Sequence, residues 1–176
     1  MYTNVTEYVI EESHETKVEE LLKEYHQKIY VYCYNILRNA HDAEDAAQEV
    51  FIKAFQSKKL MEISNSSAWL YRIAYNYCLN KIKRKKMIEF IPFAEKGRLQ
   101  KETDSSGDYS DFELSYILAQ LKPKERALIV LRIIEDKDFT EIASILEISI
   151  PNARKRFERI KAKIQKIIER RSDNGQ

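Results

Sequence analysis

The chain has 176 residues, of which 44% are hydrophobic and 33% charged, with a formal net charge of +2. Three glycines and three prolines are too few for the many turns of a β-sandwich or barrel, whereas abundant Lys, Glu, Ile, Leu and Ala favour helices. No apolar run approaches the roughly 20 residues that cross a bilayer, and Cys33 and Cys78 do not form a CxxC pair, which argues against a zinc finger or a disulfide framework.

Charge is distributed unevenly along the chain. Residues 1–24 contain seven acids and two bases, five of the six residues in KIKRKK (81–86) are basic, and residues 154–171 contain nine bases and two acids. A basic helix can simply be solvated, but two basic clusters in separate halves favour contact with a polyanion such as nucleic acid. The N-terminus lacks the basic and apolar regions of a secretory signal, so we expect a cytoplasmic protein with reduced thiols.

Three helices are predicted in the first half of the chain. Apolar residues at three- and four-residue steps place the first helix at about 16–37. A second helix is expected over 42–56, capped by Asn39 or Asp42, and a third over 68–86, capped by Ser66 or Ser67. The polar segment SKKLMEISNSS (57–67) connects the second helix to the third.

The second half resumes helical periodicity after a polar, glycine-containing stretch that is typical of a flexible linker. Helices are expected at about 112–120, 124–135, 139–146 and 150–170. The fold class is therefore all-α, with two small helical domains joined by a linker. The divisions are an acidic N-terminal extension (1–15), a first domain (16–92), the linker (93–111) and a second domain (112–171).

The segment DFTEIASILEISIPNARKRF (138–157) has the layout of a helix-turn-helix. Ile142, Ala143 and Leu146 of a short helix face inward, Ile148 fills the turn, and Ser149 caps the next helix. That helix carries amide and basic side chains suited to base edges and phosphates, namely Asn152, Arg154, Lys155, Arg156 and Arg159. A plain three-helix bundle with a basic last helix is the alternative. Glu147 occupies a turn position where glycine is usual, because a positive φ is costly for other residues.

An acidic stripe runs along the predicted second helix. Asp42, Asp45, Glu49 and Ile52 share one side with Gln48 beside them, and alanines lie on the opposite side. Acids in the first turns favour the helix dipole, and such a stripe also complements a basic partner helix. From these residues alone, solvated charge and a docking surface are equally good interpretations.

An enzyme is a more distant interpretation. His41, Glu44 and Asp45 have i, i+3, i+4 spacing that occurs in metal sites. No second set of ligands, glycine-rich phosphate loop or nucleophile-base arrangement accompanies them, so we expect no catalytic residue, metal or cofactor.

Three motifs in series resemble the extracytoplasmic-function type of bacterial sigma factor. They are DAEDAAQEVFIKAF (42–55), WLYRIAYNYCLNKIKRKK (69–86) and the C-terminal segment 121–164. The resemblance implies that the first domain, region 2, binds the clamp helices of the largest subunit of core RNA polymerase and opens the −10 promoter element. It implies that the last domain, region 4, reads the −35 element and contacts the flap of the second-largest subunit. It also implies that the linker occupies the RNA exit path and that an anti-sigma factor holds the protein inactive.

The resemblance assigns roles to residues at matching positions. Polymerase binding is assigned to Asp42, Asp45, Gln48, Glu49 and Ile52. Contact with the −10 element is assigned to Asn65, Ser66, Trp69, Arg72, Asn76, Asn80, Lys83 and Arg84, because single-stranded DNA is held by stacking surfaces and cations. Contact with the −35 element is assigned to Asn152, Arg154, Lys155, Arg156 and Arg159. Trp69 is equally well interpreted as a packing residue.

Some positions depart from the family pattern. No aromatic residue or glycine precedes Trp69 in the connector where the family captures a flipped base. Ile150 and Pro151 begin the recognition helix where relatives often have a small residue, and Lys137 replaces a common glycine. A regulator that uses the helix-turn-helix alone is the main rival, but it leaves the first domain unexplained. A toxin-gene-specific sigma factor shares the architecture and is compatible with the composition.

Overall fold

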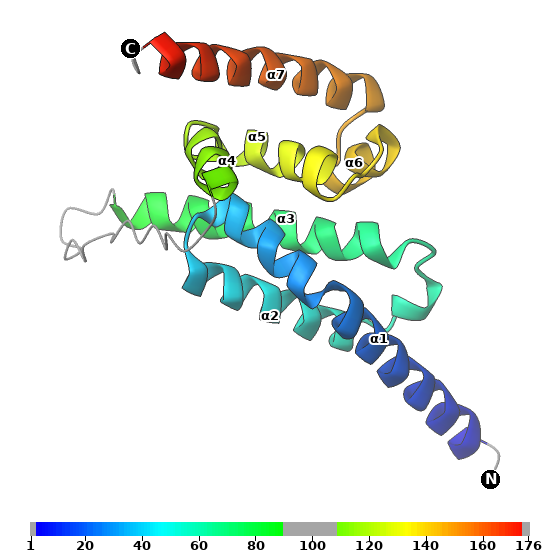
Figure 1. Ribbon diagram of the computed structural model, residues 1–176. Coiled ribbons are helices and arrows are strands. Elements are labelled where there is room, and N and C mark those ends of the chain that lie inside the picture. Colours follow the sequence, from blue (N-terminus) through cyan, green and yellow to red (C-terminus); the bar gives the residue numbers. More distant parts are fainter. Residues whose placement is uncertain (1–2, 90–108, 174–176) are drawn as a thin grey trace.

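The structure is a computed structural model that describes the backbone of residues 3–89 and 109–173 and the side chains of 13–87 and 113–172. Every regular element in these ranges is a helix, which confirms the all-α expectation. Figure 1 shows the helices in layers, with α7 on one side, α4 to α6 in the middle, and α1 to α3 on the other side.

Three long helices form the N-terminal domain. They are α1 (Thr3–Leu37), α2 (Ala40–Gln56) and α3 (Ser66–Glu89), with a short 3-10 turn, η1 (Leu60–Glu62), before α3. Asn39 caps α2 by accepting a hydrogen bond from the Asp42 amide at 2.8 Å, as expected. The cap of α3 is Asn65, whose Oδ1 accepts from the Ala68 amide at 2.8 Å, one residue earlier than predicted.

The C-terminal domain begins with α4 (Tyr109–Ala119) and α5 (Pro123–Ile129), which continues as a π-helical turn, η2 (Val130–Ile134). It then forms the predicted helix-turn-helix, α6 (Phe139–Leu146) and α7 (Ile150–Asp173). Glu147 takes φ 55° in the turn, and the Ile148 amide donates to the Ala143 carbonyl at 3.0 Å. This bond satisfies a carbonyl at the end of α6, and the expected positive φ of Glu147 is confirmed.

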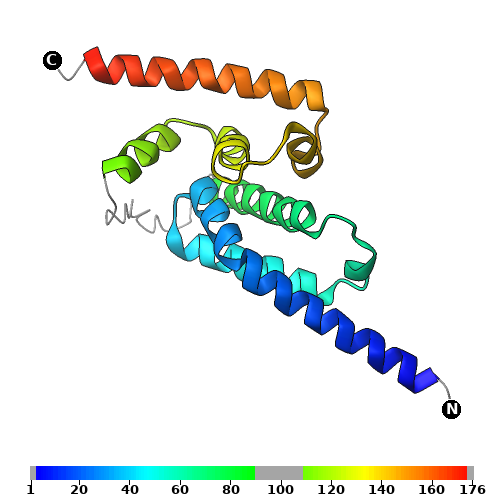
Figure 2. The same ribbon diagram turned by 45° about the vertical axis from the view of Figure 1, so that its right-hand side comes forward.

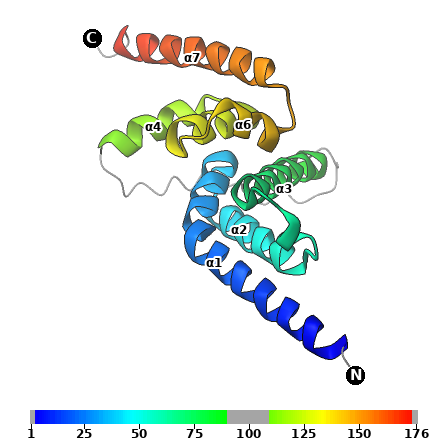
Figure 3. The same cartoon turned by 90° about the vertical axis from the view of Figure 1, so that its right-hand side faces the viewer.

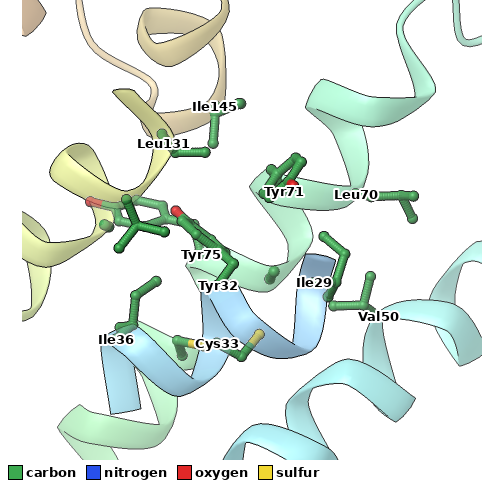
Figure 4. Close-up of a cluster of buried hydrophobic side chains, with 14 of the residues drawn as sticks. Ile29, Tyr32, Cys33, Ile36, Val50, Leu70, Tyr71, Tyr75, Leu131 and Ile145 are labelled. Carbon is green, nitrogen blue, oxygen red and sulfur yellow. The ribbon is translucent and has the colours of Figure 1, made fainter. Parts of the chain in front are cut away.

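One hydrophobic core runs through both domains. Figure 4 shows Ile29, Tyr32 and Ile36 of α1 close to side chains of α3, with Leu131 and Ile145 of the C-terminal domain beside them. The alanines of α2 that face this core are fully buried (Ala43, Ala46, Ala47 and Ala54). Their small size lets α2 pack closely against its neighbours.

The two domains pack directly against each other. Helix α6 lies on α3, and α5 lies against the C-terminal part of α1, as the view in Figure 2 also shows. Helix α1 begins at Thr3, well before the expected start at residue 16, and its N-terminal part projects beyond the bundle (Figure 3). Most of the predicted linker (93–111) lies outside the described residues.

Candidate nucleic-acid and partner interfaces

The acidic stripe of α2 divides into an inward and an outward part. Asp42 is only 8% exposed, and Lys81 of α3 lies 3.1 Å from its Oδ1 and 2.9 Å from Oδ2 of Asp45. Lys85 forms a second ion pair with Asp42. Burial alone would raise the pKa of Asp42, but the hydrogen bonds from Lys85 and Lys81 outweigh it and lower the pKa. These two acids therefore join α2 to α3.

Further along α2, the stripe faces solvent. Gln48 is exposed and, among the described residues, its side chain bonds to Glu44 of the same helix at 3.4 Å. Glu49 is half-buried and pairs with Lys53 at 3.7 Å. Ile52 is 48% exposed and Phe55, which the sequence reasoning did not single out, is 54% exposed. An exposed row with both apolar and acidic members is a candidate partner surface.

The side chains assigned to the −10 element lie on or beside α3. Asn65, Asn76, Asn80, Lys83 and Arg84 are exposed, whereas Ser66, Trp69 and Arg72 are half-buried. Of the tyrosines on the same helix, Tyr71 and Tyr75 are buried and Tyr77 is half-buried. Trp69 packs against the core with one side, so it has both a packing role and an accessible edge.

A cleft of about 450 Å³ lies beside Trp69, between the two domains. The loop before α3 and the start of α3 form one wall, and α6 forms the other. The lining residues are Glu62, Ile63, Ser64, Asn65, Ala68, Trp69, Arg72, Thr140, Glu141 and Ser144. The cleft is thus bounded by several of the −10 candidates, and α6 covers part of it.

The start of α7 carries the side chains assigned to the −35 element. Arg154, Lys155 and Arg159 are exposed, and Asn152 and Arg156 are half-buried. Arg156 Nε donates to Asn152 Oδ1 at 3.0 Å, and the Arg154 guanidinium lies 5.7 Å from the centre of the Phe139 ring. The basic face of α7 is therefore accessible to a phosphate backbone. Two of its side chains contact neighbours within the domain, Arg156 with Asn152 and Arg154 with Phe139.

Polar contacts across the domain boundary were not predicted from the sequence. The buried Arg126 of α5 donates to the Ile36 carbonyl at the end of α1 and to the Leu121 carbonyl at 2.7 Å. Burial and the nearby Arg38 lower the pKa of Arg126 to about 10. The one sequence signal is that Arg126 stands three and four residues before buried Ile129 and Val130, on the apolar side of its helix.

Other contacts join α3 to the C-terminal domain. Arg72 Nη2 donates to the Ser144 carbonyl at 2.6 Å, the Tyr71 hydroxyl donates to the Glu135 carboxylate, and Lys137 Nζ donates to Ser67 Oγ at 3.0 Å. Helix α3 and the C-terminal domain are therefore held together by hydrogen bonds as well as by the shared core.

Two of the simpler sequence expectations concern cysteines and metals. Cys33 and Cys78 are both free and buried. His41 and Asp45 approach to 4.0 Å, but no group of three or more potential ligands occurs in the described ranges. None of the helices within those ranges is both long and apolar enough to cross a bilayer.

Comparison with known proteins defines the class of this two-domain arrangement. Residues 21–87 match the family model for sigma-70 region 2, and residues 111–164 match the model for sigma-70 region 4. The region 2 match accounts for the first domain, which a regulator with only a helix-turn-helix would leave unexplained. The two domains are thus those of a sigma factor.

The curated relatives narrow the class further. The chain is 34% identical over 157 residues to the ECF RNA polymerase sigma factor SigW of Bacillus subtilis, covering 81% of this chain and 83% of SigW. It is 28% identical over 160 residues to the ECF sigma factor SigE of Mycolicibacterium smegmatis, covering 88% of this chain and 62% of SigE. The chain belongs to the ECF sigma factors, and it is an alternative sigma factor that directs RNA polymerase to specific promoters to initiate transcription.

Two solved structures share the fold. The sigma factor RpoE of Bartonella quintana, in complex with the anti-sigma factor NepR, aligns with a TM-score of 0.67 and 22% identity over 86% of this chain and 96% of that one. CnrH in complex with the cytosolic domain of CnrY aligns with a TM-score of 0.64 and 18% identity, over 92% of this chain and 96% of that one.

Proposed function

We propose a division of labour between the two domains. The N-terminal domain binds the clamp helices of the largest polymerase subunit through α2 and holds the opened −10 element on the α3 side. The C-terminal domain reads the −35 element as duplex through α7. The observation that carries this proposal is the row Gln48, Glu49, Ile52 and Phe55, in which Glu49 is half-buried and the other three are exposed. Among the described residues, His14 of α1 lies against Phe55 at one end of this row, and the rest of the row remains accessible to a partner.

The exposed row combines two kinds of contact that suit a basic partner helix. Ile52 and Phe55 offer apolar area that is removed from water on binding, and Glu49 offers a charge that complements a basic residue. Asp42 and Asp45 support the same surface from behind, because their ion pairs with Lys81 orient α2 on α3. We assign polymerase contact to the outward residues and positioning to the inward acids.

The −10 surface offers stacking and charge on one side of the domain. Trp69 lines the cleft, and α3 continues from it through Asn76 and Asn80 to Lys83 and Arg84, all exposed. Displaced bases stack on aromatic faces and the backbone follows cations. Asn65 already accepts a backbone hydrogen bond as the cap of α3, so its amide nitrogen is the group left to contact a base.

The proposed roles require the domains to separate. The −35 and −10 elements are centred about 25 base pairs apart, or roughly 85 Å of B-DNA at about 3.4 Å per base pair. Arg72, however, lies within hydrogen-bonding distance of Ser144 in α6, immediately before the recognition helix. The packed arrangement cannot contact both elements at once, so it represents the protein away from promoter DNA.

The remaining partners follow from surfaces and relatives. An apolar groove of about 380 Å³ between α4, η2 and α7, lined by residues that include Leu114, Ile133 and Phe157, fits the flap of the second-largest subunit. The two similar structures are sigma factors bound to NepR and to CnrY, so we include an anti-sigma factor among the partners. We place the protein in the cytoplasm, as an initiation factor with no catalytic activity of its own.

The test of polymerase binding uses a matched pair of charge reversals. Glu49→Lys changes the exposed row of α2, and Glu19→Lys changes α1, where Glu19 pairs with Lys23 in the same i, i+4 manner at 3.6 Å. We expect Glu49→Lys to weaken binding of the full chain to core polymerase at least tenfold, because a buried interfacial pair becomes a repulsion. Glu19→Lys should bind like the unmodified protein.

Run-off transcription with core polymerase on genomic DNA completes the test and supplies the promoters. Promoter-specific transcripts should require the chain and should decrease with Glu49→Lys. Equal affinity of the two variants for core polymerase would contradict the assignment of the α2 surface.

A further inference from the structure

The N-terminal part of α1 contacts the loop that precedes α3, here called the 57–65 loop. His14 and Lys17 stand one turn apart on α1, on the side that continues into buried Val18 and Leu21. Lys17 Nζ donates to the Leu60 carbonyl at 2.8 Å. His14 Nε2 lies 3.0 Å from the Ser57 carbonyl, and because a carbonyl only accepts, Nε2 carries the proton in this contact.

These two donors each add a second hydrogen bond to a carbonyl that already accepts one from the backbone of the loop. The Ser57 carbonyl accepts from the Leu60 amide at 3.1 Å, and the Leu60 carbonyl accepts from the Ile63 amide at 3.3 Å. Each carbonyl oxygen has a second lone pair, which the side-chain donor from α1 uses. The His14 ring packs edge-on against Phe55, with ring centres 6.2 Å apart, so the contact has an apolar component as well.

The backbone hydrogen bonds within the 57–65 loop are short-range, such as the one from the Glu62 amide to the Lys59 carbonyl at 3.0 Å. The Leu60 side chain is fully buried, and Asn65 caps α3. Between them, Met61, Glu62 and Ser64 are exposed, and the loop lines the cleft beside Trp69. The Lys17 and His14 bonds therefore tie the start of this wall to α1, and Asn65 ties its end to α3.

We propose that His14 and Lys17 are positioning residues for recognition of the −10 element. They fix the start of the 57–65 loop so that Ser64, Asn65 and Trp69 present one defined surface to the displaced strand. The proposal rests on the proposed −10 role of this surface, and it gives the N-terminal extension a function that its acidic composition does not suggest.

The variants separate the hydrogen bonds from general effects on α1. Lys17→Met keeps the apolar stem and removes the donor, and Lys17→Arg keeps a donor. His14→Phe keeps a ring against Phe55 and removes the donor. The matched control is Lys23→Met, because Lys23 is exposed on the same helix and pairs only with Glu19 among the described contacts.

The experiment uses holoenzyme assembled from core polymerase and each full-length variant. Initiation is measured on a promoter selected by the unmodified protein, with every base of the −10 and −35 elements substituted in turn. We expect Lys17→Met to reduce the discrimination between preferred and other −10 bases by about tenfold, as loss of one charge-assisted bond allows. His14→Phe should act in the same direction, Lys17→Arg should restore discrimination, and Lys23→Met should leave it unchanged.

Two readouts distinguish positioning from a general loss of function. Discrimination at the −35 element and affinity for core polymerase should be the same for Lys17→Met and Lys23→Met. Unchanged −10 discrimination in both Lys17→Met and His14→Phe would overturn the inference, and so would a parallel loss at both promoter elements. If the unmodified protein showed no preference among −10 bases, the proposed function itself would fail. That result is distinct from a −10 preference that is the same in the unmodified protein and in Lys17→Met, which would contradict only the role of Lys17.

Discussion

Removing the hydroxyl of Tyr71 is expected to weaken the contact between the two domains without changing the packing of the Tyr71 ring. The hydroxyl donates to the Glu135 carboxylate across the boundary, while the Tyr71 ring packs edge-on against Tyr32 with centres 5.2 Å apart. Tyr71→Phe removes the hydrogen bond and keeps the ring. A hydrogen bond to a charged group contributes about 1.5–3 kcal/mol to stability. Because Glu135 is half-buried and its carboxylate can be solvated once the bond is lost, we use the lower value for the contact between the domains.

A loss of about 1.5 kcal/mol shifts the equilibrium toward separated domains roughly tenfold. The protein contains a single tryptophan, Trp69, and the cleft beside it is closed on one side by α6. Domain separation should therefore make Trp69 more accessible to acrylamide. We expect stronger quenching in Tyr71→Phe and a larger radius of gyration in X-ray scattering, with helix content unchanged by circular dichroism.

Tyr32→Phe is the matched control for this experiment. The Tyr32 hydroxyl is buried and, among the described residues, has no hydrogen-bond partner. Removing an unpaired buried hydroxyl is neutral or stabilising, so Tyr32→Phe should quench and scatter like the unmodified protein. The reasoning is refuted if Tyr71→Phe and Tyr32→Phe give the same quenching and the same radius of gyration.

Two further predictions concern charge. Because the pKa of Asp42 is lowered in the folded state, its ion pairs stabilise the fold above the unfolded-state pKa of about 3.9, and this contribution is lost as pH falls through the lower folded-state pKa. The free energy of unfolding, measured with urea between pH 3 and 7, should therefore depend less on pH in Asp42→Asn than in the unmodified protein. An equal pH dependence in the two proteins would contradict the assignment. Arg154→Ala or Arg156→Ala should reduce −35-dependent transcription. If the residue contacts a phosphate, the slope of the logarithm of DNA affinity against the logarithm of salt concentration should also fall in magnitude by about one. Unchanged transcription would mean that the recognition helix is misplaced.

Local chemistry made much of the fold predictable. The helix ends follow side-chain caps, such as Asn39 before α2, and the left-handed Glu147 follows from the layout of the helix-turn-helix. The start of α1 was predicted too late, because the predicted apolar stripe begins at Val18, whereas His14 and Lys17 contact the 57–65 loop through polar groups. His14 and Lys17 contribute to that contact with hydrogen bonds, which hydrophobic periodicity does not register.

The candidate site was less predictable because its contacts join distant segments. Asp42 and Asp45 share a stripe with Glu49 in the sequence, but their partner Lys81 is more than thirty positions away, and only the crossing of α3 over α2 brings it within reach. Similarly, Arg126 bonds to a carbonyl 90 residues earlier. A helical projection tells which side chains share a face and does not tell which neighbouring helix covers that face.

The ion pairs between α2 and α3 connect the two surfaces that the sequence treated as separate. Lys81 and Lys85 of the basic cluster are held by Asp42 and Asp45, so the charge left for DNA on this part of α3 comes from its exposed neighbours, which include Lys83 and Arg84. Reversing the charge of Asp45 would weaken polymerase docking and release Lys81 at the same time. In the described part of the chain Glu49 pairs within α2, with Lys53, so Glu49 is the residue at which a change in polymerase affinity reports on docking alone.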